Sequence, residues 1–186
     1  MEKNPTDMLE EEHVVIQRVV GLMAVLIQAV EAGRPVDGQI LADIVDFMRT
    51  FADKCHHGKE EVHLFPLLEA KGVPMQGCPL GALTAEHLQG RSLVRQLEQA
   101  AQAYAAGTPD AQEALAQTLH SLAELYPGHI WKEDYLLFPM TNKILSPEEQ
   151  ASLYERFQAV DREMGEGVYH RFDQLATDLV ERLQSA

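Results

Sequence analysis

Two segments of the chain place a histidine four residues before a glutamate, a spacing suited to metal binding. These segments are His56-x-x-x-Glu60 and His129-x-x-x-Glu133, and they align without a gap through a shared Leu-Phe-Pro ending. Residues four apart lie on one face of an α-helix, so the two side chains of each pair point to the same place. Each pair is therefore able to converge on one ion.

An isolated histidine precedes each pair at nearly the same distance. His13 lies 43 residues before His56, and His87 lies 42 residues before His129. The chain therefore reads as two helical hairpins related by an internal repeat. Together they offer four imidazoles and two carboxylates, which suit two ions with the carboxylates free to bridge. The predicted ligands are His13, His56, Glu60, His87, His129 and Glu133.

The absence of a thiolate from this ligand set narrows the choice of metal. Imidazole and carboxylate suit iron, manganese or zinc. A nitrogen-rich helical site with bridging carboxylates and open positions favours two redox-active iron ions over the other metals.

A second histidine–glutamate pair overlaps the first. His57 and Glu61 have the same spacing as His56 and Glu60, and the upstream apolar stripe from Ile40 fits this second register better. The internal repeat favours the first register. The choice is left open, and His57 is retained as a seventh candidate ligand beside His56.

Glycine and proline divide the rest of the chain into long helical blocks. Breakers stand at residues 33–35, 72–79 and 107–110, and Ser146-Pro147 is suited to start a new helix. Short connections between long helices predict an all-α, up-down-up-down four-helix bundle in residues 1–146. Residues 147–186 are expected to form a C-terminal helical extension packed on it, interrupted near Gly165 and Gly167.

Apolar stripes show which helix faces should be buried. One stripe runs from Leu9 through His13 to Val30 in steps of three and four, so His13 should point into the core. A second runs from Leu115 through His129 and Glu133 to Leu136 and Met140. A buried carboxylate such as Glu133 needs a strong partner, because its desolvation is costly.

Charge and cysteine content limit the classes of partner. The formal net charge is −14, which argues against nucleic acid and membrane surfaces as partners. Two cysteines are too few for a disulfide framework. The polar N-terminus lacks a signal peptide pattern, and no apolar stretch is expected to approach membrane-spanning length. A cytoplasmic location is the expectation.

Several other polar residues have simpler expected roles than metal binding. His63, His120 and His170 have no histidine at the matching repeat position and are expected to be packed or surface residues. Cys55 is expected to be a core thiol. Glu12 and Glu86 are candidates to hydrogen-bond a ligand histidine, although a solvated helix edge is the simpler interpretation.

The doubled motif resembles the hemerythrin-like, or HHE cation-binding, family over residues 8 to about 145. The resemblance implies a four-helix bundle with an oxo- or hydroxo-bridged non-haem di-iron centre and chemistry with O2, NO, peroxide or iron itself. It departs from the oxygen carriers at Arg91, where they have a further histidine, and their last carboxylate spacing would reach Asp134 rather than Glu133. One imidazole fewer implies a more open site, closer to bacterial relatives that act in iron–sulfur repair, NO handling or redox sensing.

Two functions from different classes follow. The first is a di-iron protein that binds or reacts with a small diatomic ligand or peroxide. The second is an iron or redox sensor, or iron-handling protein, that signals through residues 147–186. The sequence leaves open whether the protein is an enzyme and whether it forms a homodimer.

Overall fold

The structure is a computed structural model and describes residues 4–184. The elements in this range are helical, which confirms the predicted all-α class. The α-helices are α1 (Pro5–Glu31), α2 (Gly38–Phe47), α3 (Phe65–Ala70), α4 (Leu80–Ala105), α5 (Ala111–Lys132), α6 (Phe138–Ile144), α7 (Pro147–Met164) and α8 (Val168–Gln184). The π-helical segments are η1 (Met48–His57), η2 (Glu60–Leu64) and η3 (Glu133–Leu137).

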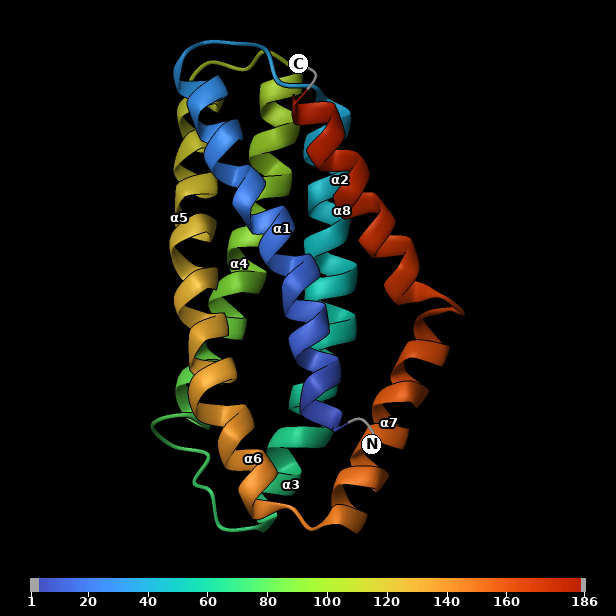
Figure 1. Cartoon of the computed structure of the whole chain (residues 1–186). Helices are drawn as coiled ribbons and strands as arrows, with labels where there is room; N and C mark the ends of the chain where they lie inside the picture. Colours follow the sequence, from blue (N-terminus) through green and yellow to red (C-terminus); the bar gives the residue numbers. More distant parts are fainter. Residues whose placement is uncertain (1–3, 185–186) are drawn as a thin grey trace.

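The π-helical segments join shorter α-helices into long rods. Residues 38–70 form one rod from α2 to α3, and residues 111–144 form another from α5 to α6. Figure 1 shows these two rods running alongside α1 and α4, with the chain reversing direction at each connection. Helix α8 lies against α1 and α2 on one side of the molecule. The long rods can therefore bring side chains from distant parts of the sequence to one level of the core.

The predicted breakers set the helix ends. The turns after α1 and α4 contain Gly33 and Gly107, each with a φ of 66°, which favours glycine because it has no Cβ. Ser146 caps α7: its side chain accepts a hydrogen bond from the backbone N–H of Glu149, whose carboxylate accepts one from the backbone N–H of Ser146. The end of α7 at Met164 and the start of α8 at Val168 confirm the predicted interruption.

Two apolar clusters form the core, and a polar layer lies between them. In α1, Leu9 belongs to one cluster and Ile16 to the other, with buried His13 between them. In the rod from α5, Ile130 and Leu137 belong to opposite clusters, with buried Glu133 between them. The candidate ligands therefore lie in a part of the core sealed above and below by apolar side chains.

The C-terminal helices contribute to both clusters. Leu153 and Phe157 of α7 pack in the cluster that contains Leu9, and Phe172 and Leu179 of α8 pack in the cluster that contains Ile16. These helices are therefore an integral part of the packing around the polar layer. The division of the chain at residue 146 stays a prediction.

The second stripe departs from the prediction near its end. Leu136 is 41% exposed and Met140 is half-buried, whereas Leu137 is fully buried. The cause is η3, because i→i+5 hydrogen bonding shifts the phase of the inward face relative to an α-helix. The expectation for Leu136 was wrong because it assumed α-helical periodicity throughout.

Helix α1 also corrects an expectation about apolar stretches. By length and composition it is able to cross a membrane, with a mean hydropathy of 1.8 over its most apolar window. Within the structure, 56% of that window is buried. A helix that is covered on several sides in a core can be as apolar as a membrane span, and α1 packs against α5 and α8.

Candidate metal centre

The polar layer brings all seven sequence-predicted ligand residues together. They come from α1, η1, η2, α4, α5 and η3, and each is at most 3% exposed: His13, His56, His57, Glu60, His87, His129 and Glu133. Burial of so many polar side chains is costly unless they bind one another or an ion. The polar layer therefore has the character of a binding site for an ion.

The π-helical segment η1 explains how consecutive histidines both face inward. The His56 ring lies 4.6 Å from that of His13, whereas the His57 ring lies 3.8 Å from that of His87. The two neighbours thus serve opposite sides of the layer. Wider i→i+5 bonding reorients successive side chains, and such segments recur at functional sites. Both histidines of the disputed register are brought to the site, together with Glu60.

The first group of donors comprises His13, His56 and Glu133, whose ligand atoms lie within 4.8 Å of one another. The Nε2 atoms of His13 and His56 are 2.9 Å apart, and Glu133 Oε2 lies 3.1 Å from His13 Nε2. Three donor atoms this close together favour a cation among them.

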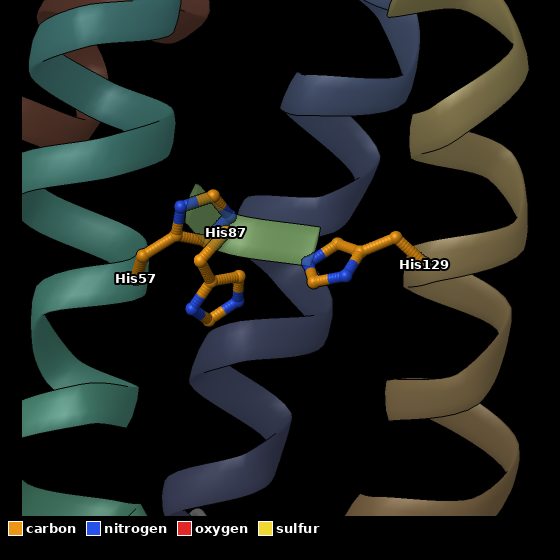
Figure 2. A group of neighbouring side chains, drawn as sticks. All are labelled: His57, His87 and His129. Carbon is orange, nitrogen blue, oxygen red and sulfur yellow. The ribbon is translucent and has the colours of Figure 1, made fainter. Parts of the chain in front are cut away.

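The second group comprises His57, His87 and His129, within the same limit of 4.8 Å. Figure 2 shows the three side chains close together, with His57 and His129 reaching in from opposite sides; the three residues belong to η1, α4 and α5. The His87 and His129 rings are 4.9 Å apart, and neither Nε2 atom has a hydrogen-bond partner. The third imidazole beside His87 and His129 comes from His57 of η1. The group contains three imidazoles, the two predicted from the internal repeat and the candidate His57.

Two carboxylates lie between the groups. Glu133 Oε2 contacts His13, while its Oε1 lies 3.2 Å from His129 Nε2. Glu60 Oε2 lies 3.9 Å from His56 Nε2 and 3.5 Å from His87 Nε2. Each carboxylate therefore reaches both groups, as a bridging ligand must.

An outer set of carboxylates binds the Nδ1 atoms of four histidines. The pairs are His13–Asp134 at 2.6 Å, His56–Glu12 at 2.9 Å, His87–Glu61 at 2.7 Å and His129–Glu86 at 3.0 Å. Such pairs hold the proton on Nδ1 and leave the Nε2 lone pair free for a metal. The pairs follow the internal repeat, because Glu61 aligns with Asp134 and Glu12 with Glu86.

The outer carboxylates refine the sequence interpretation. Glu12 is 1% exposed, so the simpler reading as a solvated helix edge was wrong for it. The roles of Glu61 and Asp134 were not predicted. The available signal was the acidic residue that follows each aligned glutamate in the repeat.

The repeat breaks where α7 covers the first hairpin. Lys59 and Lys132 occupy matching positions, and each contacts the outer glutamate of its hairpin, Glu12 or Glu86. Lys132 is 29% exposed, whereas Lys59 is fully buried and also pairs with Asp161 of α7 at 2.6 Å. Cys55, a buried core thiol as predicted, donates to the same Asp161 at 3.4 Å. The first group is therefore tied to the C-terminal helices.

Burial and mutual contact shift the pKa values in the layer. Burial raises the pKa of Glu60 well above its ordinary value, and the neighbouring Glu133 carboxylate raises it further. Burial opposes ionisation of Glu133 too, but the charge of His129 and the close imidazoles of His13 and His87 hold its pKa well below its ordinary value. Burial lowers the pKa of His56 to about 4, despite its bond to Glu12. The layer thus favours a negative Glu133 and a neutral His56, whereas the neighbouring carboxylates raise the pKa of His13.

The residues present fit a bound cation. Seven buried side-chain atoms of the layer lack any hydrogen-bond partner: His57 Nδ1, His87 Nε2, His129 Nε2 and both carboxylate oxygens of Glu60 and of Glu133. Buried polar atoms are normally satisfied, so this cluster calls for a ligand. Imidazole nitrogen and carboxylate oxygen suit iron, manganese or zinc.

The remaining histidines lie outside the layer. His120 is exposed and pairs with Glu31 at the surface, and His170 is exposed on α8, as predicted. His63 is half-buried near Arg156 and Glu163. None of the three belongs to a donor group found among residues 4–184.

The chain is similar to known proteins over most of its length. A family described as the hemerythrin HHE cation binding domain matches residues 4–141. Uncharacterized proteins of Mycobacterium tuberculosis and Mycobacterium bovis are 26% identical over 180 residues, which cover 96% of this chain and 69% of each relative. No solved structure matches the chain.

Proposed function

Because the chain belongs to the hemerythrin HHE cation-binding domain family, we propose that it is a non-haem di-iron protein that binds or reacts with a small ligand such as O2, NO or peroxide. The observation that carries the proposal is the cluster of unpartnered imidazole and carboxylate atoms in an otherwise well-packed core. We further propose that its long rods form the up-down-up-down four-helix bundle that the family resemblance implies.

The two donor groups support two ion positions. We assign His13 and His56 to the first position and His57, His87 and His129 to the second, with Glu60 and Glu133 shared. Manganese or zinc would find the same donors. Iron is favoured because a position with few imidazoles, beside shared carboxylates, leaves room for an exogenous ligand.

Bound iron would supply electrons to a small ligand such as O2, NO or peroxide. The protein's own residues do the positioning. Each outer carboxylate fixes the tautomer and orientation of one imidazole, which raises its basicity as a ligand. The apolar clusters on both sides of the layer exclude water, and thereby strengthen the electrostatic interactions within it.

Metal analysis combined with optical spectra tests this function. The purified protein is expected to contain about two irons per chain, in line with two donor groups. The anaerobically reduced protein should change its absorption on exposure to O2 and, separately, to NO. A protein that stays colourless and takes up no iron after anaerobic reconstitution contradicts the proposal.

The expectations about partners and location become part of the same proposal. We propose a small ligand as the partner, with neither nucleic acid nor a membrane, because the formal net charge of −14 opposes binding to anionic surfaces. A cytoplasmic location is proposed on the same grounds as in the sequence analysis, and homodimer formation is left open.

A second function, iron or redox sensing through the C-terminal helices, is favoured by one contact. Asp161 of α7 reaches the first donor group through Lys59 and Glu12, which binds His56. Metal loss that disturbs His56 would thereby reach α7. Limited proteolysis with and without a chelator tests this idea. Faster cleavage between α7 and α8 in the chelated protein supports sensing, and an identical pattern contradicts it.

A further inference from the structure

A cavity of about 230 Å³ lies between η1, α4 and α5. We propose that it is the entry and binding site for a small inorganic anion on its way to the metal layer. The inference rests on the proposed iron centre, whose ligand class it narrows. The lining residues used in the argument are Arg49, Asp53, His57, Arg91, Arg95 and Tyr126.

The cavity differs from neighbouring cavities because it contacts a candidate metal ligand. His57, one of the three imidazoles of the second donor group, forms part of its wall. Two other surface cavities reach only outer carboxylates: one contacts Glu12 and the other contacts Asp134. Beside Glu12, the buried Lys59 and the partly exposed Asp161 also lie between the surface and the first group. Of these three cavities, the one between η1, α4 and α5 thus contacts a candidate ligand, and the carboxylates that the second group shares with the first lie beyond it.

The charge of the wall favours an anion. Three arginines line the cavity against one acidic residue, in a chain whose formal net charge is −14. Arg91 is held by Asp53 at 2.7 Å and by Glu61 at 2.8 Å, and Arg49 is held by Glu98. Arg95 is exposed and makes no ion pair among residues 4–184. Among the described residues, Arg95 is therefore the arginine of the wall whose charge no carboxylate pairs with, and an uncompensated positive charge in a concave site attracts anions.

Two buried polar groups on the wall are also without hydrogen-bond partners. His57 Nδ1 is buried and makes no hydrogen bond, although the carboxylate of Asp53 lies 3.4 Å away. Tyr126 is 3% exposed, and no hydrogen bond engages its hydroxyl among the described residues. Burial raises the pKa of Tyr126, so the hydroxyl keeps its proton and is able to donate a hydrogen bond to an anion. Because Tyr126 lines the cavity, its hydroxyl is placed to donate a hydrogen bond to a small ligand there.

The size of the cavity restricts the ligand further. Sites for drug-sized molecules measure roughly 300–1,000 Å³, whereas one water occupies about 30 Å³ of the liquid. A volume of about 230 Å³ therefore suits an ion of a few atoms, together with some water. Azide is a suitable probe because it is a small linear anion that gives a visible complex with ferric di-iron centres.

The first experiment measures the rate of azide association with the iron-loaded protein by stopped-flow absorption. Arg95→Gln is expected to lower the rate about threefold at low ionic strength, with the difference shrinking as salt is added. Arg34→Gln is the matched control, because it removes the same charge in the α1–α2 turn, away from the cavity lining. Equal rates for wild type and Arg95→Gln at low salt overturn anion selectivity.

The second experiment narrows the cavity without changing its charge. A Cβ added at Gly90 would lie 3.4 Å from the Tyr126 hydroxyl, whereas one at Gly128 would meet nothing within 4 Å. Gly90→Val is therefore expected to slow both azide and neutral NO, and Gly128→Val neither. Arg95→Gln should slow azide but not NO. Unchanged rates for both ligands in Gly90→Val overturn the entry route.

A third measurement separates this proposal from the proposed function. Crystals of metal-free protein soaked in bromide should show anomalous density beside Arg95 and Tyr126. The result does not depend on iron, so a protein that fails to bind iron still tests the cavity. Iron binding without bromide in the cavity, together with salt-independent azide association, contradicts the anion site and leaves the iron centre standing.

Discussion

The Nε2 atoms of His13 and His56 lie 2.9 Å apart, and the Nδ1 atom of each ring is bonded to its own carboxylate, Asp134 or Glu12. If both carboxylates hold protons on Nδ1, both Nε2 atoms carry lone pairs that face each other. A metal ion or a proton must lie between them. The same pair of atoms is therefore a metal site when loaded and a proton site when empty.

The proton alternative predicts how the metal-free protein responds to pH. Burial would lower the pKa of His13, but its hydrogen bond to Asp134 and the nearby Glu133 carboxylate raise that pKa to about 9, from 6.5 for the unfolded chain. A raised histidine pKa adds stability that is fully present below pH 6.5 and is lost as the pH rises through about 9. Burial likewise raises the pKa of Glu60, so its contribution to stability also falls as the pH rises.

Urea unfolding of the chelated protein should therefore show falling stability between pH 6.5 and 9, while the metal-loaded protein falls less because metal replaces the proton. Metal uptake at pH 7.5 should also release protons into a weakly buffered solution. A His13→Gln variant is expected to lose most of the alkaline decline. Equal pH profiles for loaded and chelated protein contradict this account.

Iron stoichiometry tests the second donor group. His129→Ala removes an imidazole that lies 3.2 Å from the shared carboxylate of Glu133, so it should lower the iron content from about two towards one per chain. His120→Ala is the control on the same helix, because His120 is exposed and bonds only Glu31 among the described residues. Iron analysis of folded protein, checked by circular dichroism, gives the answer; equal iron in the two variants removes His129 from the site.

A separate prediction concerns His57, which the structure brings beside His87. His57→Ala should weaken metal at the second position, whereas His63→Ala, six residues further along the same rod, should leave metal content unchanged. The measurement is the rate of iron loss to an excess of a chelator. If His57→Ala loses iron no faster than His63→Ala, then the second position holds its ion through His87 and His129 without His57.

The internal repeat explains why most of the layer was predictable. A ligand in one hairpin implies its partner in the other, and the breakers set where each helix ends. His57 lacked this support because Ile130 occupies its matching position. Only the π-helical geometry of η1 turns two consecutive histidines inward, and periodicity read at 3.6 residues per turn does not contain it. The same cause led to the wrong expectation for Leu136.

Residues beyond the repeat were out of reach for a different reason. Asp161 lies in the C-terminal helices, where no pattern connects it to Lys59, more than a hundred residues earlier. Its contact exists because α7 packs against η1 and η2. Tertiary packing of this kind leaves no local trace in the sequence. The break in symmetry between the two hairpins is therefore a finding of the structure alone.

Asp161→Asn tests whether the contact between Asp161 and Lys59 stabilises the first donor group. Lys59 is fully buried between Glu12 and Asp161, so loss of the Asp161 charge leaves a buried ammonium with one carboxylate that also binds His56. Weakening a buried charged hydrogen bond should cost about 1–3 kcal/mol of unfolding free energy, towards the lower end because Asp161 is 23% exposed.

The matched control is Asp173→Asn, because Asp173 pairs with Arg18 at a site where both side chains are about one-third exposed. Its cost should stay within about 1 kcal/mol. Urea unfolding of the iron-loaded variants measures both. If Asp161 acts on the metal through Lys59, Glu12 and His56, Asp161→Asn should also release one iron faster than wild type while Asp173→Asn does not. A stability loss with unchanged iron release assigns Asp161 to packing of α7 alone.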